Sequence, residues 1–189
     1  MRRKDDEKQK NIKHAVIKLI LEEGFHGTSI SKIAKEANVS PATVYTYFSN
    51  KEEMLQDIYI EYTEEIYTCL VHTTQQDLSG KRRLESIIRN YYNYILENHD
   101  AFSFVEQFSS CPSLAGSCSE EYVLYRFYNL IDALKKEHIV KGFSDDSLIK
   151  IIFYPVKAIA LDYRKNNREK EMQLIEMIQI IQSAILVHP

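Results

Sequence analysis

The sequence predicts an all-α protein, and three observations carry that prediction. Apolar residues recur at spacings of three and four along most of the 189-residue chain, which is the period of an amphipathic helix. No alternating pattern of useful length indicates a strand. The chain has only 5 Gly and 4 Pro, too few for a fold rich in tight turns. We therefore expect about nine helices: an N-terminal three-helix head and a C-terminal helical bundle.

The first helix is predicted from about residue 5 to residue 23. Its apolar stripe contains Ile12, Val16 and Ile20, and Gly24 follows the last turn, where a glycine commonly ends a helix. Thr28 and Ser29 then offer side chains that can cap a short second helix. That helix is expected to end near residue 38.

The third helix is predicted from residue 41 to about residue 48. Ser40 followed by Pro41 is a strong start, because serine caps well and proline fits the first helical position. Ser49, with Glu52 three residues later, forms a capping box for a fourth helix that can continue to about residue 74.

The remaining helices are predicted from the same periodicity, over residues 84–96, 101–108, 120–140, 145–165 and 168–186. Pro155 lies inside one of them and should bend or locally break it. We expect two domains, residues 1–50 and residues 51–189.

Charge is unevenly distributed along the chain. Residues 1–51 hold 10 Lys and Arg against 6 Asp and Glu, whereas the whole chain has a net charge of −3. A basic head on an acidic body indicates that one end meets a polyanion, although a solvated helical surface would give the same imbalance.

The second and third helices form a helix-turn-helix arrangement. Ala34 and Ala37 are small enough for close packing between the two helices. The third helix presents short, hydrogen-bonding side chains near its start, as a helix that enters the major groove requires. Residues 27–55, GTSISKIAKEANVSPATVYTYFSNKEEML, resemble the DNA-binding signature of the TetR/AcrR family of transcriptional regulators.

The resemblance implies a homodimeric all-α regulator that binds double-stranded DNA. It implies a repressor that leaves a pseudo-palindromic operator when a small molecule occupies the body. The family often has glycine where this chain has Ala42, so its base preference does not transfer. The positions that match DNA contacts of the family are Ser29, Ser31, Ser40, Pro41, Ala42, Thr43, Tyr45, Thr46, Tyr47 and Lys51. Tyr47 and Lys51 match phosphate contacts.

Aromatic residues are concentrated in the centre of the body. A cluster of rings with tyrosine hydroxyls is typical of a pocket for an apolar or aromatic molecule, and an ordinary helical core would give the same pattern. The candidate ligand-binding residues are Tyr91, Tyr92, Phe102, Phe104, Glu106, Phe108, Tyr125 and Tyr128.

The last two helices carry more apolar surface than one face needs, which indicates burial against a second subunit. The candidate dimer residues are Ile152, Val156, Ile159, Tyr163, Ile178, Ile181 and Ile185.

Two other functions remain open at the level of sequence. A protein partner or oxidation of Cys111 and Cys118 could replace the small molecule as the signal. A helical enzyme or carrier could use the aromatic cavity, but no catalytic motif is present, so we expect no enzyme. We also expect no metal site, no cofactor, no membrane span and a cytoplasmic location, because no Cys/His cluster, long apolar segment or signal peptide occurs.

Overall fold

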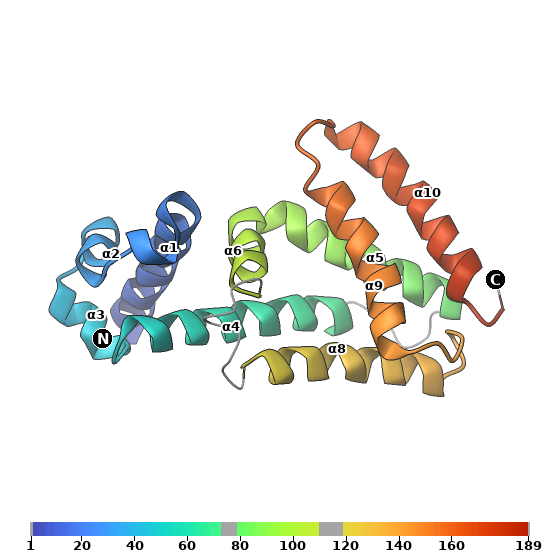
Figure 1. Cartoon of the computed structure of the whole chain (residues 1–189), viewed down its shortest axis with the longest axis horizontal. Coiled ribbons are helices and arrows are strands. Elements are labelled where there is room, and N and C mark those ends of the chain that lie inside the picture. The colour runs from blue at the N-terminus through green and yellow to red at the C-terminus, as the bar shows by residue number, and fades with distance from the viewer. Residues whose placement is uncertain (1, 73–78, 110–118, 189) are drawn as a thin grey trace. The chain divides into compact units, whose positions relative to one another are not determined.

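The computed structural model describes residues 2–72, 79–109 and 119–188, and in these segments it is all-α (Figure 1). Nine helices occur among the described residues. By its internal contacts the chain divides into two compact units: Met1–Thr63 with Asp100–Glu120, and Glu64–His99 with Glu121–Pro189. The predicted fold class is confirmed, whereas the domain boundary at residue 50 stays a prediction.

The first unit contains the predicted three-helix head. Its helices are α1 (Arg2–Gly27), α2 (Ile30–Glu36) and α3 (Pro41–Tyr47), followed by the beginning of α4 (Lys51–His72) and by α6 (His99–Ser109). Residues buried between them make one apolar core: Ile12, Val16, Ile20, Ile33, Ala34, Val44, Phe48, Met54, Leu55 and Ile58. Burial of these side chains supplies the main driving force that holds short helices such as α2 and α3 in place.

A glycine interrupts α1 where the sequence predicts the end of a helix. Gly24 has φ 73° and ψ 176°, which are not helical angles. After Gly24 the chain makes one more short helical turn, which ends at Gly27. The hydroxyl of Thr28, a buried residue, donates a hydrogen bond of 2.9 Å to the Gly24 carbonyl oxygen. This bond fixes the direction in which the chain enters α2.

The start of α4 differs from the prediction by one residue. Asn50, not Ser49, accepts the hydrogen bond from the Glu53 backbone N–H, at 2.8 Å, and α4 begins at Lys51. Asparagine and serine are similarly good caps, so the sequence pattern alone could not choose between the two neighbours.

The second unit contains the rest of α4, most of α8 (Ser119–Lys136), and α5 (Gly80–Glu97), α9 (Asp145–Ala160) and α10 (Asn167–Ile185). Figure 1 shows α9 and α10 as a pair of connected helices, and α5 packs against both. Pro155 lies within α9 and the helix continues through it, so a local break is wrong and a bend stays a prediction. A short antiparallel bridge between Val140 and Leu186 holds the end of α10.

None of the described helices has both the length and the apolar character needed to cross a membrane.

Candidate functional site

The turn between α2 and α3 is held by backbone hydrogen bonds and one residue in the left-handed region. The N–H of Val39 donates to the Ala34 carbonyl oxygen at 2.9 Å. Asn38 has φ 54°, a conformation that asparagine tolerates better than most residues. Val44 and Phe48 then anchor α3 in the head, so the opposite face of α3 is turned outward.

The outward face of α3 consists of small polar and aromatic side chains. Pro41, Ala42, Tyr45 and Thr46 are exposed, and Tyr45 has 55% of its surface accessible. This exposure excludes a core role for Tyr45. A two-turn helix with such a face fits the start of a recognition helix, whose first residues contact base edges in the major groove.

Two hydroxyl groups of α3 are already used within the helix. Ser40 caps the helix by accepting from the Thr43 N–H at 3.1 Å, and its hydroxyl also lies 2.9 Å from the Thr43 hydroxyl. Thr43 is half-buried, and Thr46 donates to the Ala42 carbonyl oxygen at 3.0 Å. The side chains of Ser40, Thr43 and Thr46 are therefore held in fixed orientations, while their remaining hydrogen-bonding capacity is available to bases or phosphates.

The other predicted contacts lie around the same face. Ser29 and Ser31 are exposed at the start of α2, and the Ser29 hydroxyl caps α2 by accepting from the Lys32 N–H at 3.3 Å. Tyr47 is half-buried at the end of α3. Lys51 is the exception, because its ammonium group is bound to backbone carbonyl oxygens inside the head.

Ion pairs reduce the positive charge that the head can offer to DNA. Lys18 pairs with Glu36 at 2.6 Å, and that hydrogen bond raises the pKa of the Lys18 ammonium. Lys32 pairs with Glu23 at 2.5 Å, and Lys13 pairs with Glu61. Counting lysines in the sequence therefore overestimates the charge that is available to phosphates.

Comparison with known proteins agrees with this geometry. Residues 12–58 match the family model of bacterial regulatory proteins, tetR family. This segment is a DNA-binding domain of the TetR family. The match covers α1 from residue 12 onward, α2, α3 and the first turns of α4, which are the elements that build and support the outward face of α3.

Relatives extend the TetR likeness beyond the head. The fatty acid metabolism regulator protein of Bacillus subtilis is 28% identical over 130 residues, 68% of this chain and 66% of that protein. An HTH-type transcriptional regulator of Haemophilus influenzae is 27% identical over 122 residues and 63% of its own length. The chain thus covers about two thirds or less of these TetR relatives.

Solved structures show the same fold over nearly the whole chain. A TetR family transcription regulator from Marinobacter aquaeolei has a TM-score of 0.84 at 21% identity and covers 98% of this chain and 99% of its own. The regulator FadR from Bacillus subtilis, solved in complex with stearoyl-CoA, has a TM-score of 0.72 at 21% identity and covers 92% and 97%. These likenesses establish the TetR fold for the body as well as the head.

The predicted ligand-binding residues are divided between the two compact units. Phe102, Phe104 and Phe108 are buried on α6 in the first unit, where Phe108 stacks on Tyr59 with ring centres 4.5 Å apart. Glu106, also on α6, is half-buried. These rings therefore have core contacts in the first unit.

The second unit holds the other four predicted ligand residues. Tyr91 and Tyr92 are buried on α5, and Tyr91 meets Phe153 of α9 edge-on at 4.9 Å. Tyr125 is 60% exposed and Tyr128 is half-buried, both on α8. Cys111 and Cys118 lie outside the described residues. A ligand role for the aromatic residues stays a prediction.

The predicted dimer residues lie mostly in the core of their own chain. Six are buried: Ile152, Val156, Ile159, Ile178, Ile181 and Ile185. Tyr163 is 92% exposed. The apolar residues that α9 and α10 leave exposed are others, namely Ile151, Tyr154, Met172, Ile175 and Ile180. Periodicity identified the apolar helices, and a dimer role for the seven predicted residues stays a prediction.

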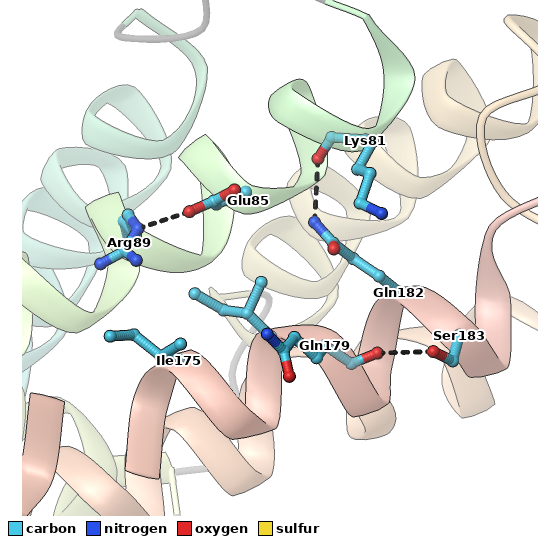
Figure 2. Close-up of a pocket in the computed structure, with 8 residues that line it drawn as sticks. Lys81, Glu85, Arg89, Ile175, Gln179, Gln182 and Ser183 are labelled. Carbon is cyan, nitrogen blue, oxygen red and sulfur yellow. Dashed lines mark hydrogen bonds and ion pairs between the residues drawn. The ribbon is translucent and has the colours of Figure 1, made fainter. Parts of the chain in front are cut away.

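A groove of about 480 Å³ runs between α5 and α10 (Figure 2). The side-chain amide of Gln182, a buried polar residue, donates to the Lys81 carbonyl oxygen at 3.1 Å. Arg89 is bound by Glu85 and Glu171, each at 2.8 Å. Two carboxylates therefore already neutralise Arg89, and Lys81 is a second cation in the lining of the groove.

Proposed function

We propose that this TetR-family chain is a ligand-responsive repressor that binds a pseudo-palindromic operator as a homodimer. The outward face of α3, with Tyr45 exposed and Val44 buried, is the observation that carries the proposal. One such helix per chain reads one half-site, so two chains are needed to contact successive major-groove faces about 34–36 Å apart.

The proposed dimer interface is the exposed apolar stripe of α9 and α10. Ile151, Tyr154, Ile175 and Ile180 are 42–53% exposed, which is unusual for side chains of this size on adjacent helices. Two copies of this stripe can cover each other in an isologous four-helix arrangement. Tyr163 lies just beyond the end of α9 and would lie at the edge of that contact.

The proposed effector is a small molecule with an apolar or aromatic part, and the first candidate is a long-chain acyl-CoA, whose acyl chain is apolar. Support comes from the Bacillus subtilis relatives, one named a fatty acid metabolism regulator and one solved with stearoyl-CoA. The effector must bind the DNA-free conformation better than the DNA-bound one, because equal affinity for both would leave the equilibrium between the two conformations unchanged.

Linkage provides the test of the effector. Protein bound to a duplex that was selected from a random pool is titrated with stearoyl-CoA, with coenzyme A alone and stearate as controls. We expect stearoyl-CoA to release the duplex, and the duplex to weaken stearoyl-CoA binding by the same factor, typically 5–150-fold. Tight binding of stearoyl-CoA with no effect on DNA affinity would refute the allosteric proposal. Absence of binding would refute this effector.

A further inference from the structure

Lys51 occupies an unfavourable position in its own helix. It is the first residue of α4, where the helix dipole is positive and a cation is normally destabilising. The side chain is half-buried, and its ammonium group donates to the carbonyl oxygens of Phe25 and Thr28 at 2.6 and 2.9 Å. The same group lies 3.9 Å from the centre of the Phe25 ring.

The acceptors explain why a lysine is stable at this position. Phe25 follows the break at Gly24, in the last turn of α1, where carbonyl oxygens lack partners within the helix. Thr28 directly precedes Ser29, the cap of α2. The Lys51 ammonium group, at the start of α4, therefore donates hydrogen bonds to the backbone that joins α1 to α2.

A second contact joins the same two helices further along. Lys13 of α1 pairs with Glu61 of α4, and the Lys13 side chain is only 12% exposed. Between the two contacts, Met54, Leu55 and Ile58 of α4 are buried in the head core. The first turns of α4 are thus held to α1 by a polar contact at Lys51, by a second one at Glu61, and by apolar packing between the two.

We propose that Lys51 is a positioning residue that fixes α4 to the α1–α2 junction, and that it does not neutralise a DNA phosphate. The proposal rests on DNA binding by the head. A lysine that moved to a phosphate would lose two charged hydrogen bonds and a cation–π contact in exchange for one screened ion pair. The orientation of α2 and α3 relative to α4 would also lose its support.

Salt dependence separates the two roles. Each lysine that neutralises a phosphate adds about 0.9 to the slope of log affinity against log salt concentration. We compare the full-length wild type with Lys51→Met, which keeps the side-chain stem, and Phe25→Leu, which removes the ring but no charge. Lys32→Met is the matched control, because the Lys32 ammonium group binds the Gly27 carbonyl oxygen and Glu23, which both belong to the same end of α1.

Affinity is measured for the duplex selected by the wild type, at temperatures at which every variant is fully folded. For Lys51→Met and Phe25→Leu we expect a roughly tenfold loss of affinity, the scale of one charged hydrogen bond, with an unchanged salt slope. The double variant should lose little more than either single variant, because both remove the same contact.

Three results would overturn the positioning role. One is a lower slope for Lys51→Met, which would make Lys51 a phosphate contact. Another is wild-type DNA affinity for a folded Phe25→Leu variant, because the ring contact would then contribute nothing to DNA binding. The third is an equal loss for Lys32→Met at unchanged slope, because the effect would then follow from any lost contact at the end of α1. Failure of the wild type to select a duplex would instead refute the proposed function.

Discussion

The Lys51 ammonium group lies 3.9 Å from the centre of the Phe25 ring, although 26 positions separate the two residues in the chain. In the sequence, Lys51 begins the KEEML segment that resembles the start of the fourth TetR helix, and a phosphate contact was the natural interpretation. The contact with Phe25 gives the same lysine a function inside the head. The same residue type at a motif position can therefore act on the fold rather than on the DNA.

Substitution of Gly24 tests the break in α1. At φ 73° an L-residue is strained, although a Cβ there would meet no atom within 4 Å. We expect Gly24→Ala to lower the free energy of unfolding by about 1 kcal/mol, measured by denaturant titration. Gly142 is the matched control, since a Cβ there also meets nothing and its φ is not positive. Equal losses for both alanine variants would mean that the conformation of Gly24 is not the cause.

Substitutions in α3 separate base contacts from phosphate contacts. Thr43→Ala should change which duplexes are selected from a random pool, because Thr43 lies in the first turn of α3, where a recognition helix contacts base edges. Tyr47→Phe, which removes only a hydroxyl from a predicted phosphate position, should weaken binding to all sequences about equally. An unchanged selected sequence for Thr43→Ala, with affinity reduced uniformly, would remove Thr43 from the base-reading surface.

Charge placed on the exposed stripe of α10 tests the dimer interface. Ile180 is 53% exposed, so Ile180→Glu should leave each chain folded and raise the dimer dissociation constant by roughly tenfold or more. Sedimentation velocity over a range of concentrations measures the change. Phe143→Glu is the control, because Phe143 is 50% exposed but lies before α9, outside the stripe. Equal dissociation by both variants would place the interface elsewhere.

The pKa of Asp57 predicts a pH-dependent change in stability. Asp57 is exposed, but partial desolvation raises the pKa of its carboxyl group and Glu53 raises it further, against an opposing effect of Lys13. Ionisation of Asp57 is therefore less favourable in the folded state, and stability is lost as pH rises through the carboxyl range.

Asp57→Asn should accordingly raise the melting temperature slightly at pH 7. The gain should disappear near pH 3, where the wild-type carboxyl is protonated in both states. Asp146→Asn serves as the control, because Asp146 pairs with Lys150 at 2.6 Å and its replacement should not stabilise the protein. A gain for Asp57→Asn that grows on acidification would contradict the cause assigned here.

The head was predictable from sequence because its signals are local. The cap at Ser40, the proline after it and the glycine that ends the first helix act within a few residues, and each was found where the pattern placed it. The sequence alone did not predict whether Tyr45 is exposed, since a tyrosine next to a buried valine can be either buried in the core or exposed to solvent. It follows from Val44 and Phe48, which fix the rotation of α3.

The body was less predictable because burial there depends on distant partners. Ile178 and Ile181 form an apolar seam on α10, and periodicity cannot tell whether that seam is covered by the same chain or by a second one. The structure covers them within the chain, since α10 packs on both α5 and α9. Gln182, a polar residue in the same buried seam, became understandable only when its partner, the Lys81 carbonyl oxygen on α5, was located.

The central claim is that two copies of α3 read two half-sites of one duplex. Selection of bound duplexes from a random pool by the full-length protein, followed by measurement of the number of chains per duplex, tests it most directly. We predict an enriched inverted repeat bound by two chains, with half-site centres about 34–36 Å or a multiple of that distance apart. No enriched sequence, or an asymmetric site bound at full affinity by one chain, would contradict it.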